Sequence, residues 1–142
     1  RDALELVGLF QFRNRPAKKY SLGMKQRLGL AGALIGRPPI LILDEPTNGL
    51  DPAGIHEIRT LIKSLPRQFD CTVLVSSHLL SEVGLMADEI GILKHGRLLF
   101  EGTMDELRSS AHEAGFPTDN LEETFLAMID EDNRKGGGRA WH

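Results

Sequence analysis

The feature that most constrains the fold is a run of four aliphatic residues, 40–43, followed directly by Asp44 and Glu45. The run is too short for a helix and has no polar alternation, so it is typical of a strand buried on both faces, as in a parallel sheet. Pro46 cannot continue a hydrogen-bonded ladder, and the Asn-Gly pair at 48–49 favours a turn. The stretch predicts an α/β fold in which a strand ends at a charged pair.

Two interpretations of the acidic pair are open on this stretch alone. Most acidic residues are exposed, so the pair can be a solvated strand end. Ligands of open α/β sheets bind at the carboxyl ends of strands, however. Hydrolysis of a nucleoside triphosphate needs a carboxylate for Mg²⁺ and a group that orients the attacking water. Asp44 suits the first role and Glu45 the second, and we favour this Walker B interpretation.

A helix and a second strand extend this unit. Residues 52–65 have an apolar helical face, with Asp51 as the N-cap and Pro66 as the stop. The apolar run at 71–75 predicts a second buried strand, parallel to the first. His78 follows that strand, and if the strands are neighbours its imidazole can reach a terminal phosphate or the attacking water.

The segment before the first strand predicts a helix from Ser21, its N-cap, to about residue 36. The free N–H groups and the positive dipole end make a helix start with Ser21 and Gly23 a possible anion site. The same pattern is more often only a helix cap. A short helix at 2–10 and another at 121–129 are also predicted, and residues 89–101 indicate a hairpin.

Composition narrows the class of protein. The 142 residues, 41% hydrophobic and 26% charged, are typical of one soluble globular domain. A net charge of −3 does not support a nucleic-acid-binding surface, and no apolar run approaches the ~20 residues of a membrane span. The single cysteine, Cys71, excludes an internal disulfide and is expected to be a packed thiol. Because the chain begins at Arg1, we expect it to be a piece of a longer protein.

Three blocks together resemble the nucleotide-binding subunit of ABC transporters. Residues 20–27 match the signature motif, 43–52 the Walker B motif and D-loop, and 76–78 the H-loop, in the family's order and at about its spacing. The resemblance covers roughly residues 2–131. The hairpin and the last helix also resemble the drug and peptide-antibiotic exporter branch.

The resemblance implies an α/β fold, the C-terminal half of a P-loop NTPase (RecA-like) domain with parallel core strands. A signature helix would come from the helical subdomain, and a β-hairpin with helices would close the chain. Residues 1–37 would then be a remnant of the helical subdomain, 38–130 the second half of the ATP-binding core, and 131–142 a flexible tail.

The resemblance also implies roles for the strand-end residues. Asp44 would hold Mg²⁺, usually through water, and Glu45 would be the general base. His78 would contact the γ-phosphate of ATP and link it to Glu45.

Other residues would act across a head-to-tail dimer of two nucleotide-binding subunits that share ATP. Asp51 would lie in the D-loop at that interface, and Ser21 and Gly23 would grip the γ-phosphate of the ATP held by the opposite subunit, with Met24 as a further ATP-binding residue of the same motif. Two positions depart from the commonest signature, because Leu22 stands where glycine is usual and Met24 where glutamine is usual.

A P-loop requires a Gly-Lys pair, and none of the six lysines follows a glycine. We therefore expect the intact protein to be an ATPase that powers export of a drug- or peptide-like substrate through separate transmembrane permease subunits, and this chain alone to turn over little ATP. The resemblance places the subunit at the cytoplasmic face of the membrane, held there by the permease, with no nucleic-acid partner. Two alternatives are a soluble non-transport ABC ATPase on ribosomes or DNA, and a catalytically silent truncated interaction module.

Overall fold

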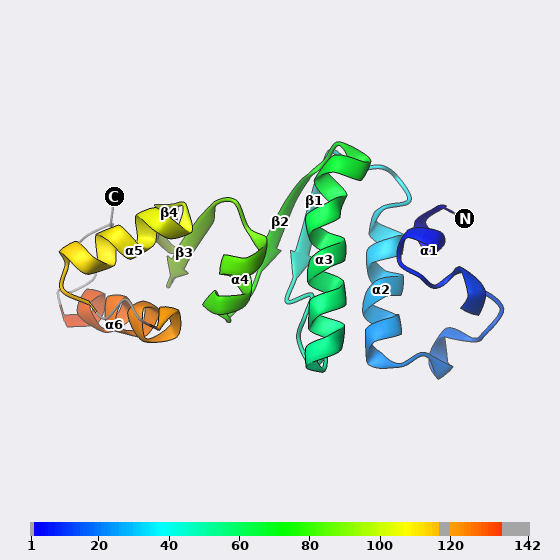
Figure 1. Cartoon of the computed structure of the whole chain (residues 1–142), viewed down its shortest axis with the longest axis horizontal. Helices are drawn as coiled ribbons and strands as arrows, with labels where there is room; N and C mark the ends of the chain where they lie inside the picture. The colour runs from blue at the N-terminus through cyan, green and yellow to red at the C-terminus, as the bar shows by residue number, and fades with distance from the viewer. Residues whose placement is uncertain (1, 117–119, 135–142) are drawn as a thin grey trace. The chain divides into compact units, whose positions relative to one another are not determined.

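The computed structural model describes residues 2–116 and 120–134 (Figure 1). The chain divides into two compact units, Arg1–His78 and Leu79–His142, and each is described by itself. Residues within each unit contact one another more than they contact residues of the other unit. The boundary expected between residues 37 and 38 concerns the subdomains of an intact ATP-binding domain, and it stays a prediction.

The first unit contains two parallel strands and the helices packed on them. Its elements are α1 (Asp2–Leu6), two 3₁₀ turns (Phe10–Phe12 and Ala17–Lys19), α2 (Leu22–Ala33), β1 (Ile40–Asp44), α3 (Pro52–Phe69) and β2 (Thr72–Ser76). The two strands pair in parallel, from Ile40 opposite Thr72 to Asp44 opposite Ser76. The predicted strand–helix–strand unit is confirmed.

Local capping explains where the two long helices begin. The Ser21 hydroxyl accepts a hydrogen bond from the Met24 N–H at 3.3 Å, and Asp51 Oδ1 accepts one from the Gly54 N–H at 3.0 Å. Each bond satisfies one of the backbone donors that a helix start leaves without an intrahelical partner. Both predicted N-caps are therefore confirmed.

The prediction that Pro66 ends the helix is wrong. Helix α3 includes Pro66 and continues to Phe69, after which Asp70 adopts a left-handed conformation with φ of 51°. Proline removes one N–H and strains the preceding turn. Leu65, however, is fully buried, and Phe69 packs against the same core, so this packing holds the last turn in helical form.

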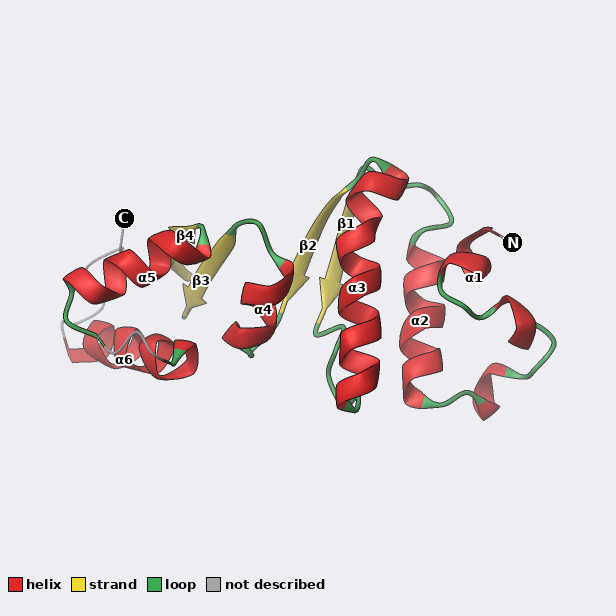
Figure 2. Cartoon of the chain, in the orientation of Figure 1, coloured by secondary structure: helices red, strands yellow, loops and turns green. Residues whose placement is uncertain are grey.

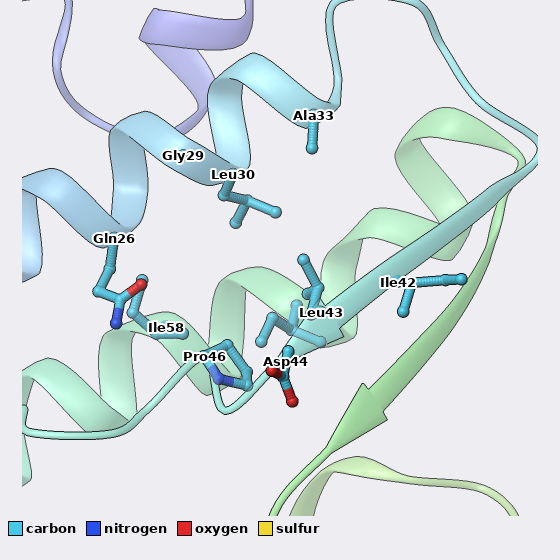
Figure 3. A pocket seen from close by; sticks show the side chains of 10 residues that line it. Gln26, Gly29, Leu30, Ala33, Ile42, Leu43, Asp44, Pro46 and Ile58 are labelled. Carbon is cyan, nitrogen blue, oxygen red and sulfur yellow. The ribbon is translucent and has the colours of Figure 1, made fainter.

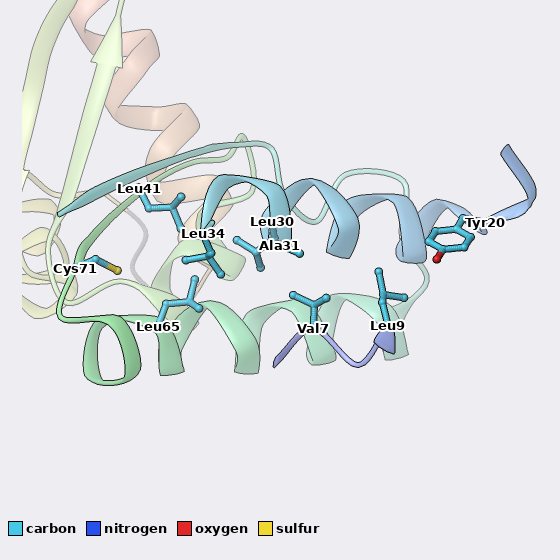
Figure 4. Packing of buried hydrophobic residues seen from close by; sticks show 9 residues of the cluster. All are labelled: Val7, Leu9, Tyr20, Leu30, Ala31, Leu34, Leu41, Leu65 and Cys71. Carbon is cyan, nitrogen blue, oxygen red and sulfur yellow. The ribbon is translucent and has the colours of Figure 1, made fainter. Parts of the chain in front are cut away.

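The core of the first unit lies between α2, α3 and one face of the strands (Figure 4). Its buried members are Val7, Leu9, Tyr20, Leu30, Ala31, Leu34, Leu41, Leu65 and Cys71. The expectation of a packed Cys71 thiol is confirmed, because this residue is buried within the cluster.

The other face of the two strands is open, so the prediction of strands buried on both faces is wrong for this chain. Ile40 is 61% exposed, Ile42 70% and Leu74 60%, whereas Leu41, which points to the opposite face, is 3% exposed. Alternate side chains of a strand point to opposite faces. The helices α2 and α3 cover the Leu41 face, and no described element of this unit covers the other.

Over residues 79–116 and 120–134, the second unit combines an antiparallel hairpin with three helices (Figure 2). Its elements are α4 (Leu80–Met86), β3 (Ile90–Lys94), β4 (Arg97–Gly102), α5 (Met104–Glu113) and α6 (Leu121–Arg134). The predicted hairpin is confirmed, with a register irregularity between Ile92 and Leu93. Helix α6 continues to Arg134, and residues 135–142 of the expected tail lie outside the described residues.

Two acidic side chains cap helices in this unit. Thr103 and Glu106 form a capping box at the start of α5, and bonds from Thr103 lower the pKa of the Glu106 carboxyl. Helix α4 starts without a side-chain bond from its own N-cap, Leu79. Instead the Ser81 N–H donates to Glu122 Oε1 of α6 at 3.1 Å. Within the described residues, no helix is long and apolar enough to cross a bilayer.

Candidate nucleotide-hydrolysis site

The predicted functional residues gather at one edge of the first unit. The C-terminal ends of β1 and β2 and the N-terminal ends of α2 and α3 all lie at this edge, the lower one in Figure 1. The parallel pairing of β1 and β2 causes this arrangement, because the crossover helix returns the chain so that both strands run the same way. Open α/β sheets bind their ligands at such an edge.

His78 and Glu45 are in direct contact there. The His78 Nδ1 atom lies 2.9 Å from Glu45 Oε1 and 3.0 Å from Oε2. An ionised carboxylate only accepts hydrogen bonds, so the bond requires the proton of the imidazole on Nδ1. In the neutral ring Nε2 is then an acceptor, and in the charged ring it is a second donor. Glu45 therefore selects the tautomer of His78.

Asp44 and Glu45 are also joined to the end of β2 through Ser76. The Ser76 hydroxyl donates to Asp44 Oδ1 and accepts a bond from the Glu45 backbone N–H at 3.2 Å. The same N–H lies 3.1 Å from the Ser76 carbonyl oxygen. The sequence motifs alone indicate no separate role for Ser76. The signal that identifies it is the strand register, which pairs Asp44 with Ser76 as the last residues of two five-residue strands.

The backbone of Glu45 is unusual. Its φ is +46°, in the left-handed region that non-glycine residues rarely adopt. Such conformations persist only where surrounding contacts determine them, and they cluster at functional sites. Here the N–H of Glu45 is held by Ser76, its carbonyl accepts from the Asn48 N–H at 3.1 Å, and its carboxylate is held by His78.

The residues of the expected trans site lie at the same edge, at the start of α2. Ser21 is engaged as a cap, and the Met24 side chain packs against the hydrophobic core. The Leu22 side chain lies close to Gly49 in the loop that follows β1. A Cβ atom added at Gly49 would be only 3.0 Å from Leu22 Cδ2. A Cβ on Gly23 would likewise lie 3.6 Å from Leu50 Cδ2. The first residues of α2, Leu22 and Gly23, therefore lie close to the loop before Asp51 within one chain.

The donor set of the strand ends suits Mg²⁺ bound with a nucleotide. Mg²⁺ is usually held by one or two carboxylates together with substrate phosphates and water, and not by a complete protein cage. Over residues 2–116 and 120–134 there is no group of three or more His, Cys, Asp or Glu side chains placed to hold a metal ion. Asp44, with one carboxylate oxygen bound by Ser76, fits the role of a single-carboxylate ligand.

A pocket of about 200 Å³ lies beside this edge, between α2, β1 and α3 (Figure 3). Its walls are mainly apolar, and its polar side chains are Gln26 and Asp44. A triphosphate needs a cradle of backbone N–H groups and cations, which this pocket does not provide. The pocket is lined both by α2 and by β1, the strand that carries Asp44.

Comparison with known proteins agrees with this geometry. A family model described as "AAA domain, putative AbiEii toxin, Type IV TA system" matches residues 12–84. The chain is 51% identical over 107 residues to the bacitracin transport ATP-binding protein BcrA of Bacillus licheniformis, covering 75% of this chain and 35% of that protein. It is 47% identical over 126 residues to the lantibiotic transport ATP-binding protein SrtF of Streptococcus pyogenes, covering 89% of this chain and 50% of that protein.

A solved structure of an ABC transporter component is also similar to this chain. CbiO1 from Clostridium perfringens, described as part of the ABC transporter complex cbiONQ, matches with a TM-score of 0.71 and 32% identity. The match covers 80% of this chain and 47% of that one. The chain spans about a third to a half of the length of the curated relatives named above.

The fold and the strand-end carboxylates define part of a P-loop-type α/β nucleotide-binding domain. Its motifs and relatives narrow the class further. The chain belongs to the family of ABC transporter ATP-binding proteins.

Proposed function

We propose that the protein containing this chain hydrolyses ATP to power the export of a drug- or peptide-like substrate through separate membrane subunits. The observation that carries the proposal is the contact between His78 and Glu45 beside Asp44 at the ends of two parallel strands. The transport function is supported by the names of the relatives, which transport bacitracin and lantibiotics.

The three side chains divide the chemistry between them. Mg²⁺ held by Asp44 would neutralise charge on the phosphates of ATP. Glu45 would accept a proton from the attacking water. In its charged form, His78 would donate Nδ1–H to the Glu45 carboxylate and Nε2–H to a partner such as the terminal phosphate. Each group is held by a neighbour, so little reorganisation is needed at the moment of reaction.

The N-terminal end of α2 would bind the ATP that a second subunit holds. Ser21 and Gly23 lie at a helix N-terminus, where N–H groups and the helix dipole favour an anion. We assign Ser21 and Gly23 to the γ-phosphate of ATP on an opposing copy, Met24 to the same ATP-binding turn, and Asp51 to the interface between copies. The partners would be a second nucleotide-binding subunit and membrane permease subunits, which would hold the protein at the cytoplasmic face of the membrane.

The deciding experiment measures ATP binding and hydrolysis in the full-length protein with Mg²⁺. The Glu45→Gln variant should bind ATP normally and lose hydrolysis by roughly 10²–10⁴-fold, the usual contribution of a general base. Glu101→Gln, in the hairpin, is the matched control and should hydrolyse ATP at the wild-type rate. Retained turnover in Glu45→Gln would remove Glu45 from its role.

A second experiment tests the action across the dimer. Ser21→Arg places a long cation where a phosphate is expected to approach, and it should abolish ATP-driven dimerisation measured by size-exclusion chromatography in a Glu45→Gln background. Dimers that survive this change would contradict the assignment of Ser21.

The absent Gly-Lys pair carries a proposal about this chain by itself. Without a phosphate cradle, the purified 142-residue chain should bind nucleotide weakly and turn over little or none. Magnesium-dependent ATPase activity of this chain, abolished by Glu45→Gln, would contradict that expectation.

A further inference from the structure

We propose that Ser76 is a positioning residue for both catalytic carboxylates. Its hydroxyl fixes the orientation of the Asp44 carboxylate toward the metal, and it holds the main chain of Glu45 in the conformation that the base requires. The inference rests on the proposed function of this site, and it adds a residue for which the motif comparison gave no role.

The strand register brings the three residues together. Asp44 and Ser76 are partners at the ends of β1 and β2, and paired residues project to the same side of a sheet. Glu45 follows immediately, and its N–H points back to the end of β2, where it lies 3.2 Å from Ser76 Oγ and 3.1 Å from the Ser76 carbonyl oxygen. Ser76 therefore contacts both acidic residues from one position.

The direction of each hydrogen bond is fixed by chemistry. A backbone N–H only donates, so the Ser76 oxygen must accept from Glu45. An ionised carboxylate only accepts, so the single hydroxyl proton of Ser76 must go to Asp44 Oδ1. A hydroxyl supplies one donor and two acceptor sites, and this site uses both functions at once. Alanine can supply neither.

The bond to Asp44 orients a metal ligand. With Oδ1 bound by Ser76, rotation of the carboxylate about its Cβ–Cγ bond is restricted, and Oδ2 becomes the oxygen presented to the metal or its water. Groups that orient a metal ligand in this way tune its affinity without contacting the metal, and their loss costs about 10–100-fold in metal affinity or activity.

The bond to Glu45 stabilises a backbone conformation that is otherwise unfavourable. Glu45 has a φ of +46°, and its N–H is shared between the hydroxyl and carbonyl oxygens of Ser76. His78 contacts only the far end of the Glu45 side chain. Ser76, the last residue of β2, and His78, two positions later, thus hold opposite ends of the same residue.

The test uses the full-length protein and four variants. Ser76→Ala removes the hydroxyl, Ser76→Cys replaces it with a thiol that is a weak donor and acceptor, and Ser76→Thr retains it. Thr72→Ala, on the same strand and face, is the matched control for loss of a hydroxyl. We measure kcat and KM for MgATP, and, by electron paramagnetic resonance, the affinity for Mn²⁺ in the presence of ATP. Thermal unfolding reports whether each variant folds.

We expect Ser76→Ala and Ser76→Cys to lower kcat about 10–100-fold with a smaller change in KM, and to weaken Mn²⁺ binding several-fold. Ser76→Thr and Thr72→Ala should keep both quantities near those of the wild type. Wild-type kcat and Mn²⁺ affinity in either Ser76→Ala or Ser76→Cys would overturn the proposal, as would a Ser76→Thr variant as impaired as Ser76→Ala.

The outcome is separable from that of the proposed function. If Glu45→Gln abolishes hydrolysis while Ser76→Ala and Ser76→Cys match the wild type, the ATPase assignment stands and the role of Ser76 falls. If Glu45→Gln leaves hydrolysis intact, the assignment of the site itself is wrong.

Discussion

The Nδ1 atom of His78 lies within 3.0 Å of both carboxylate oxygens of Glu45, so a single imidazole N–H is directed at the middle of the carboxylate. The two residues are 33 positions apart in the sequence. They meet because β1 and β2 are parallel neighbours and each residue follows the end of its strand. The contact gives His78 a defined tautomer and Glu45 a defined orientation.

This contact leads to a prediction about His78. In the proposed ATPase reaction, His78→Ala should lower kcat of the full-length protein by roughly 10²-fold or more, because Glu45 would lose its orienting donor and the phosphate its proposed partner. KM for MgATP should change much less. Steady-state kinetics of His78→Ala beside His112→Ala, at the exposed end of α5, measure this effect. A rise in KM with unchanged kcat would instead assign His78 to ground-state binding.

Arg27 should contribute to the stability of the first unit. Its guanidinium donates to the Val7 carbonyl at 3.3 Å and pairs with Glu57 of α3. The Glu57 carboxylate is exposed, so solvent weakens the ion pair and the bond to Val7 carries most of the effect. We expect Arg27→Ala to lower the free energy of unfolding by about 1–2 kcal/mol. Urea unfolding of Arg27→Ala and of Lys25→Ala, its exposed neighbour on α2, provides the measurement. Equal losses of unfolding free energy in the two variants would show that removing a positive charge, and not the bond to Val7, causes the effect.

Gly49 is predicted to be intolerant of a side chain for two separate reasons. Its φ is +74°, which costs an L-residue roughly 1–2 kcal/mol, and a Cβ would lie 3.0 Å from Leu22 Cδ2. Gly49→Ala should therefore be more destabilising than Gly96→Ala, which has a φ of +75° with open space around it. The double variant Leu22→Ala/Gly49→Ala should recover only the part of the lost stability that comes from the steric clash, and not the part that comes from the positive φ. Thermal unfolding of this set separates the two costs, and no recovery in the double variant would show that Leu22 moves aside freely.

The second unit should lose stability in acid through Glu122. Hydrogen bonds from Ser81, first from its side chain and then from its backbone, lower the pKa of the Glu122 carboxyl below 4.5, its ordinary value. The unfolded chain thus takes up this proton at a higher pH than the folded chain. The stabilisation is complete above about pH 4.5 and is lost as pH falls through the lower folded pKa.

Glu122→Gln tests this dependence. Melting temperature measured between pH 7 and pH 3 should fall less steeply below pH 4.5 in Glu122→Gln than in the wild type. The matched control is Glu113→Gln, at the exposed end of α5, which should follow the wild-type curve. Parallel curves for all three proteins would show that the cap of α4 does not depend on the charge of Glu122.

Features with local causes could be predicted from the sequence. Ser21, Asp51 and Thr103 each cap the helix that follows, because a cap depends on residues only three positions apart. The parallel pairing of β1 and β2 also followed from local signals, since an apolar strand, an amphipathic helix and a second apolar strand have few ways to pack.

Features that depend on register or on distant packing could not be predicted. Ser76 acquires its partners only when β2 is aligned residue by residue with β1. The left-handed backbone of Glu45 is held by contacts with Ser76, Asn48 and His78, and nothing in the residue type indicates it. Pro66 was expected to end α3, but the buried side chain of Leu65 preserves the last turn. An all-aliphatic run likewise cannot indicate whether one or both faces of its strand are covered.

The bare face of β1 and β2 has a consequence for anyone who purifies this chain. Three large aliphatic side chains on this face are exposed to solvent, those of Ile40, Ile42 and Leu74. Solutions of the isolated chain should therefore be colloidally unstable, turning cloudy as concentration rises. Ile42→Lys, which places a charge in the middle of this apolar patch, should keep such solutions clear in light scattering.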